Sequence, residues 1–224
     1  MTQANFLKSG IAALSISTLA LAAGLFSSQA AVASPTYLPT GAQANVALST
    51  ITGGGWTQCY AATMAVSIGN AAENVLTSCS GDYLMMAGRA TGSDTFLALA
   101  AALRADTIVD TGQTSVTHSA NGAEWYYSPN WSWGFTAAGD RVQNNQCDVS
   151  ASSPLSMCLH TLSGVGGFRI NDNMWLNGST NYEKVFFQAN GKENYVPEPS
   201  TLALLPLVLG GAFLASRRRK AAAK

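Results

Sequence analysis

Residues 124–135 have the sequence EWYYSPNWSWGF, and this stretch predicts two β-strands joined by a turn. Aromatic side chains occupy alternate positions within 125–127 and again within 131–135. Alternate residues of a strand lie on the same face of its sheet. The Ser-Pro-Asn sequence at 128–130 is typical of a turn between two strands. The stretch therefore predicts two neighbouring strands, each with one aromatic face.

An aromatic face of this kind has two interpretations. The simpler one places the rings in the core, as the inner face of a β-sandwich. In the other, exposed rings form a platform on which the apolar C–H faces of sugars stack, while polar neighbours reach the sugar hydroxyls. The pattern does not separate the two. The residues that would contact carbohydrate in the second interpretation are Trp125, Tyr127, Trp131 and Trp133.

Turn residues extend the β pattern along the chain. Glycine or Asn-Gly steps recur about every ten residues between positions 53 and 178, with short apolar runs between them. This spacing favours an all-β single domain of sandwich or jelly-roll type, with minor helix. Residues 93–105, SDTFLALAAALRA, fit both a helix and a strand, and the strand is slightly preferred. The sequence GNAAENV at 69–75 predicts a short helical turn.

The first 33 residues have the features of a secretory signal peptide. Lys8 precedes an apolar stretch at 11–26, and Ala-Val-Ala at 31–33 supplies the small residues of a cleavage site. We therefore predict cleavage after Ala33. The alternative is an uncleaved N-terminal anchor, because the apolar stretch is longer than is usual for a signal peptide.

The C-terminal tail combines a Pro-Glu-Pro step, an apolar segment at 201–216 and a basic cluster. As a helix with a rise of about 1.5 Å per residue, the apolar segment covers about 24 Å, against roughly 30 Å for a hydrocarbon core. This length is marginal for a permanent transmembrane helix. The basic cluster predicts a cytoplasmic C-terminus, with the preceding domain outside. The step and the cluster consist of Pro197, Glu198, Pro199, Arg217, Arg218 and Arg219, followed by Lys220.

Residues 197–220 resemble the PEP-CTERM sorting signal of Gram-negative bacteria. The resemblance implies recognition by exosortase, a membrane protease-transpeptidase. It also implies transient insertion into the inner membrane, processing near the Pro-Glu-Pro step, and release or attachment at the cell surface. Such proteins are often made by bacteria that produce exopolysaccharide and biofilm matrix. The central region, in ANGAEWYYS and LNGSTNYEKVFFQ for example, resembles an uncharacterised domain of secreted bacterial proteins, which implies no particular chemistry.

These features divide the chain into five predicted parts. They are a signal peptide at 1–33, a lead-in segment at 34–54, a β-rich extracellular domain at 55–187, a linker at 188–196 and the sorting signal at 197–220. Between the two targeting ends lie six basic and eleven acidic residues, a net charge of −5. An acidic exported domain has no electrostatic basis for binding a phosphate backbone, so nucleic acid is not an expected partner.

The four cysteines all lie in the region predicted to be exported, where an even count predicts two disulfides. Three pairings are possible. We favour Cys59–Cys79 and Cys147–Cys158, because each closes a short local loop. A zinc site is the alternative, but the spacing within neither pair fits zinc ligands.

No pattern assigns a catalytic residue, a cofactor or a metal site. The Asp-Thr-Gly at 110–112 resembles the aspartic protease motif, but the sequence has no second copy, so we interpret it as a turn. His118 and His160 are the only histidines available as bases, and no G-x-S-x-G nucleophile motif occurs. Residues 171–179, NDNMWLNGS, offer oxygen ligands but lack the pattern of a calcium loop.

The sequence therefore predicts an exported protein that inserts transiently in the inner membrane and then resides at the cell surface or in the extracellular matrix. We expect exosortase to be its processing partner and exopolysaccharide to be its ligand, in a non-catalytic role. The alternative is a secreted hydrolase that acts on polysaccharide.

Overall fold

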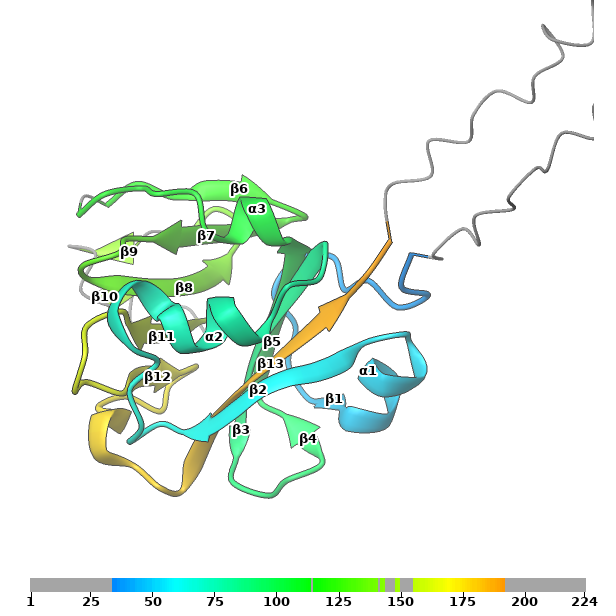
Figure 1. Cartoon of the computed structure of the whole chain (residues 1–224), viewed down its shortest axis with the longest axis horizontal. Coiled ribbons are helices and arrows are strands. Elements are labelled where there is room, and N and C mark those ends of the chain that lie inside the picture. Colours follow the sequence, from blue (N-terminus) through cyan, green and yellow to red (C-terminus); the bar gives the residue numbers. More distant parts are fainter. Residues whose placement is uncertain (1–33, 114, 141, 144–147, 150–154, 192–224) are drawn as a thin grey trace, which may run out of the picture. The chain divides into compact units, whose positions relative to one another are not determined.

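The computed structural model describes residues 34–191, apart from 114, 141, 144–147 and 150–154 (Figure 1). The predicted signal peptide, the sorting signal and most of the predicted linker lie outside the described residues. Within the described part of the chain, no helix is long and apolar enough to cross a membrane. The predicted membrane segment at 201–216 lies outside the described residues.

Two antiparallel sheets dominate the structure, which confirms the prediction of a β-rich domain. The four-stranded sheet, here called sheet A, has the strand order β2-β13-β3-β5. Its strands are β2 (Thr57–Thr63), β13 (Tyr182–Ala189), β3 (Tyr83–Ala90) and β5 (Ala98–Leu103). The five-stranded sheet, here called sheet B, has the order β12-β11-β8-β7-β6. Its strands are β12 (Gly167–Ile170), β11 (Met157–His160), β8 (Ser132–Ala137), β7 (Ala123–Tyr127) and β6 (His118–Ala120).

The remaining elements are short. Two small antiparallel pairs join β1 (Val46–Ala47) to β4 (Thr95–Phe96), and β9 (Val142–Gln143) to β10 (Asp148–Val149). The helices are α1 (Leu48–Gly53), α2 (Glu73–Ser78) and α3 (Arg104–Thr107), with 3₁₀ turns η1 (Asn70–Ala72) and η2 (Leu176–Gly178). The strand interpretation of residues 93–105 is confirmed by β4 and β5, and the predicted helical turn at 69–75 is confirmed by η1 and the start of α2.

The inner faces of sheets A and B share one apolar core. At its centre, the indole of Trp133 in β8 lies 5.2 Å from the ring of Phe186 in β13, measured between ring centroids. The Trp133 Nε1 donates a hydrogen bond to the carbonyl oxygen of Thr107 at 2.7 Å, so the only polar atom of this indole is satisfied inside the core. The two sheets are therefore packed face to face through their aromatic side chains.

Sheet A also has a second apolar cluster, made by the alternate residues of the same strands. Met85 and Phe187 contribute to it, and the chain before β2 covers it with Ile51 of α1 and with Trp56. The Trp56 Nε1 donates to the carbonyl oxygen of Tyr37 at 2.6 Å. The segment predicted as a lead-in before the domain is therefore part of it: although much of this segment is at the surface, it forms β1 and α1 and buries one face of sheet A.

A disulfide joins Cys59 in β2 to Cys79 at the end of α2, as predicted. It closes a loop of 20 residues, and in the chain-entropy model such a loop contributes about 3 kcal/mol. The disulfide is consistent with an extracellular or periplasmic location, where such bonds persist. Cys158 is buried in β11, but Cys147 lies outside the described residues, so the pairing Cys147–Cys158 stays a prediction.

Lys184 in β13 is fully buried, with its ammonium group held by backbone carbonyls. Its Nζ donates to the carbonyl oxygen of Thr63 at 2.7 Å and to that of Val66. Neither ion pair found among the described residues includes it. Burial disfavours the charged form and lowers the pKa of Lys184 from 10.5 to about 8. The folded protein therefore releases this proton at a lower pH than the unfolded chain does.

We predict that the free energy of unfolding rises with pH between about 8 and 9.5. In this window the unfolded chain keeps the lysine proton while the folded state loses it, so stability increases with pH. At about 1.4 kcal/mol per pKa unit, the rise over this window is on the order of 1.5 kcal/mol. Urea denaturation at successive pH values measures it. Lys184→Met, whose side chain has a similar length, should remove most of the rise, and an equal slope in both proteins would rule out this lysine as its source.

Candidate functional site

A cavity of about 400 Å³ opens at one end of sheet B. Its volume lies within the ~300–1,000 Å³ range of small-ligand sites. Its lining comes from the turn between β7 and β8, from β11 and β12 with the loop between them, and from η2. We call it the aromatic pocket, and define it by Trp131, His160, Leu162, Val165, Phe168, Trp175 and Asn177.

Thr161, just after β11, holds the turn between β7 and β8 in place. Its buried hydroxyl donates to the carbonyl oxygen of Ser128 at 2.6 Å and accepts from the backbone N–H of Trp131 at 2.8 Å. The backbone N–H of Thr161 also donates to the carbonyl oxygen of Trp131 at 3.2 Å. These three bonds anchor the backbone of Trp131, whose partly exposed side chain lines the aromatic pocket.

Three further lining residues place their aromatic rings in a row. The imidazole of His160 lies 6.1 Å from the ring of Phe168, which in turn lies 5.0 Å from the indole of Trp175, and both pairs meet edge to face. Trp175 is 76% exposed, the highest value among the large apolar side chains of the described residues. Its backbone has a φ of 64°, which a bulky residue rarely adopts. Strained backbone of this kind is enriched at ligand sites.

The electrostatics of the aromatic pocket favour an uncharged ligand. The described residues that line it include no acidic or basic side chain other than His160. Burial lowers the pKa of His160, and the side chain of Asn177 opposes this effect only in part, so the imidazole is neutral at pH 7. The His160 Nε2 is buried without a hydrogen-bond partner among the described residues. The pocket thus combines apolar rings with a few polar groups and no formal charge.

The structure places three of the four proposed sugar-contacting residues in the core. Trp125, Tyr127 and Trp133 are at most 7% exposed and belong to the cluster between the two sheets. A ring whose faces are covered by protein cannot stack on a sugar, so the platform interpretation is wrong for these three residues and the core interpretation holds. Trp131 differs, because it lies in the turn before β8 and lines the aromatic pocket.

Sequence reasoning missed two ring-bearing residues of the aromatic pocket. Trp175 is the single aromatic residue of the asparagine-rich stretch 171–179, and a large aromatic residue in such a loop is a signal that could have identified it. Phe168 has no such signal, because a single aromatic residue in a short strand, here between Gly167 and Arg169, does not indicate a ligand site. His160, a candidate base in the sequence, has no carboxylate beside it in the described lining, and its imidazole lies against the ring of Phe168.

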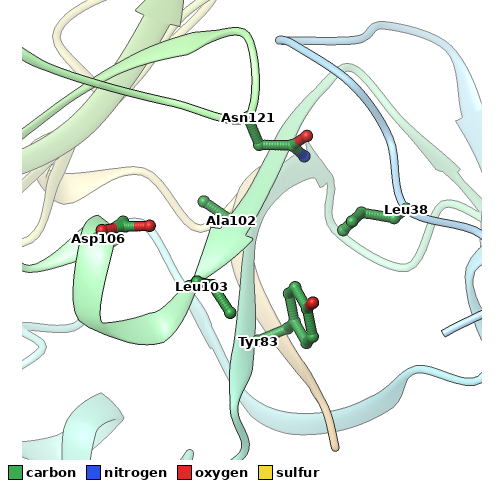
Figure 2. A pocket seen from close by; sticks show the side chains of 6 residues that line it. All are labelled: Leu38, Tyr83, Ala102, Leu103, Asp106 and Asn121. Carbon is green, nitrogen blue, oxygen red and sulfur yellow. The ribbon is translucent and has the colours of Figure 1, made fainter. Parts of the chain in front are cut away.

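A second, smaller cavity of about 230 Å³ lies beside β5 (Figure 2). Leu38 and Tyr83 line one side, and Asp106 of α3 lies on the other side of the strand, as Figure 2 shows. The amide nitrogen of Asn121 is engaged by the carbonyl oxygens of Pro39 and Ala101 at 2.8 and 2.9 Å. The cavity is below the usual size of a ligand site, and its polar groups are spread around it, so it is the weaker candidate.

The remaining residues that the sequence suggested as catalytic or metal-binding candidates take part in turns and surface contacts. Asp110 accepts a hydrogen bond from the backbone N–H of Gly112 at 2.8 Å, which is the geometry of a turn, as expected. His118 pairs with Asp106 at 3.4 Å across a partly exposed surface. No group of three or more histidine, cysteine or acidic side chains placed to hold a metal ion occurs in the described part of the chain.

Comparison with protein-family models, with curated proteins and with solved structures found no match for this chain.

We predict that Trp133→Ala and Trp131→Ala differ strongly in stability. Removing the fully buried indole of Trp133 leaves a cavity between the sheets and an unpaired carbonyl at Thr107, which should lower the free energy of unfolding by about 3–5 kcal/mol. The partly exposed Trp131 should cost about 1 kcal/mol or less. Urea denaturation of the two variants measures both values. Equal losses would contradict the division of this stretch into core and pocket residues.

Proposed function

We propose that this protein is exported to the bacterial cell surface or extracellular matrix and binds polysaccharide in the aromatic pocket, without catalysing a reaction. The observation that carries the proposal is the exposed indole of Trp175, packed against Phe168 in a pocket that Trp131 also lines. Exposed apolar side chains gathered around a cavity are typical of ligand-binding grooves.

A neutral sugar fits the chemistry of this site. A pyranose ring has apolar C–H faces that stack on an indole, and hydroxyls around its edge that need hydrogen-bond partners. The side-chain amide of Asn177 and the imidazole of His160, whose Nε2 is itself buried, are among the polar groups of the lining residues. Both can donate or accept, and neither carries a charge at pH 7. An anionic ligand would find no compensating cation among the described lining residues.

Export is supported by the sequence at both ends and by the disulfide between them. The disulfide Cys59–Cys79 suits an oxidising compartment. The stretch at 1–33 directs secretion, and the tail at 197–220 retains the chain transiently in the inner membrane. Exosortase then processes the tail near Pro197, Glu198 and Pro199, and the folded domain reaches the surface or the matrix.

A secreted hydrolase that acts on polysaccharide is the alternative. It would need a base with a partner that orients it or shares its proton. His160 is the only titratable side chain among the described lining residues, and no carboxylate lines the pocket with it. We therefore assign binding rather than hydrolysis. Turnover of a polysaccharide that His160→Ala abolishes would overturn this assignment.

We predict that Trp175→Ala weakens the binding of a neutral polysaccharide at least tenfold, because the main stacking surface is lost. This corresponds to about 1.4 kcal/mol of binding free energy. A glycan array identifies the ligand, and isothermal titration calorimetry measures the affinity. The melting temperature should hardly change, since the side chain is mostly exposed.

Met174→Ala is the matched control for this experiment. Met174 is adjacent in sequence and also exposed, but it does not line the aromatic pocket. It should bind as the wild type does. Equal weakening by both substitutions, or no neutral glycan bound by the wild type, would contradict the proposed site.

We predict that the domain is found outside the cytoplasm and that this depends on the tail. Replacing Pro197, Glu198 and Pro199 with alanine should leave unprocessed chain in the inner membrane, because the processing enzyme no longer recognises it. Cell fractionation with an antibody against the β-rich domain measures the distribution. Full-length protein in the cytoplasm, or an unchanged distribution in the variant, would refute the predicted route.

A further inference from the structure

The two ends of the described domain meet at one point. Gly191 lies against Ser34 so closely that a Cβ atom at Gly191 would be 2.5 Å from the Cα of Ser34. The backbone N–H of Gly191 donates to the Oδ2 of Asp82 at 3.0 Å, which holds this end in place. Ser34 is the first residue after the predicted signal-peptide cleavage, and Gly191 begins the path toward the predicted sorting signal.

Both ends are fastened to the domain beyond this single contact. On the N-terminal side, the carbonyl oxygen of Tyr37 accepts from the Trp56 indole, and its N–H donates to the carbonyl oxygen of Gly54 at 3.3 Å. On the C-terminal side, the Oε1 of Gln188 accepts from two consecutive backbone N–H groups, those of residues 80 and 81, at 2.7 and 3.0 Å. The chain therefore enters and leaves the domain at a fixed place, here called the exit pole and defined by Ser34 and Gly191.

The aromatic pocket lies at the other end of β13. Trp175 and Asn177 precede the strand, which begins at Tyr182, whereas Gly191 follows its last residue, Ala189. A strand of eight residues spans about 26 Å at roughly 3.3 Å per residue. Figure 1 shows the gold segment that precedes β13 at one end of the orange strand, and the other end of the strand on the far side of the domain.

We propose that the domain is held by its exit pole, so that it presents the aromatic pocket away from the membrane. This inference rests on the proposed function, because it takes the tail at 197–220 as the membrane attachment. The ten residues from Gly191 to position 201 reach at most about 35 Å when fully extended. The exit pole stays within that reach of the bilayer, whereas the aromatic pocket can lie farther from the bilayer by up to about the length of β13.

The arrangement allows the pocket to bind a polymer while the tail is still inserted. An open pocket beside the bilayer would face lipid headgroups, and a long polysaccharide could not pass it freely. At the distal end, the pocket faces the space in which a matrix polymer lies. The aromatic pocket can therefore bind its ligand both before and after the tail is processed, since processing near Pro197 takes place in the chain that follows the exit pole.

Two glycines provide a matched pair of label positions. Gly53 lies near the exit pole, because Gly54 and Gly55 contact the chain at Tyr37 and Pro35. Gly178 lies in η2, beside the aromatic pocket. A Cβ atom at either position would have no neighbour within 4 Å, and neither has a positive φ, so both accept cysteine.

The test is lipid quenching of a fluorophore attached at each position. The full chain with Gly53→Cys or Gly178→Cys is purified with its native cysteines oxidised, labelled at the new thiol, and reconstituted into vesicles whose lipid headgroups carry nitroxide quenchers. We expect the label at position 53 to be quenched several-fold more strongly than the label at position 178. Unlabelled vesicles give the reference intensity for each variant.

The outcomes separate this inference from the proposed function. Vesicle flotation shows first whether the full chain associates with the bilayer. If it does not, the proposed membrane attachment fails and the orientation fails with it. If the chain associates and the two labels are quenched equally, or position 178 is quenched more, the orientation alone is overturned and the proposed function stands.

Discussion

The insertion of β13 between β2 and β3 is the constraint on which the rest of the structure depends. The last strand of the described chain pairs with Thr57–Thr63 on one side and with Tyr83–Ala90 on the other, so sheet A is complete only when the C-terminal part of the domain has been made. Closing such long loops costs conformational entropy before any contact is gained. The Cys59–Cys79 disulfide links β2 to the end of α2, next to the strand that β13 must find. It therefore limits the separation of the two strands that β13 has to bridge.

The local parts of this fold could be predicted from the sequence, because their determinants are adjacent. The Asn-Gly step at 121–122 is such a case. Its residues have φ values of 47° and 76°, and they join β6 to β7 as the two-residue turn that this pair favours. The alternating aromatics of 125–127 and 131–135 likewise form the two neighbouring strands that their spacing predicts. In both cases the physical information lies within a dozen residues.

Which face of each strand is buried could not be predicted in the same way, because burial depends on residues that are distant in the sequence. Trp133 is in the core because Phe186 covers it, more than fifty residues later in the chain. The ambiguity of 93–105 has a similar origin. Sheet A is buried on both faces, so β5 has no polar face and its alternation disappears. A run of alanine and leucine is then compatible with a strand and with a helix, with only a slight preference for the strand, and the pairing with β3 decides between them.

The candidate site combines both kinds of information, which is why only one of its rings was anticipated. Trp131 belongs to the local turn, whereas Phe168 and Trp175 reach the same pocket through β12 and η2. What brings them together is again β13. Its first residue, Tyr182, donates to the Oδ1 of Asn173 at 2.9 Å and so ties the Trp175 segment to sheet A, while its last residue leads to the exit pole. β13 therefore completes the core, supports the aromatic pocket at its first residue, and at its last residue leads the chain to the exit pole. A substitution that weakens the pairing of β13 should disturb all three together, whereas a change in the pocket rings leaves the core and the exit pole intact.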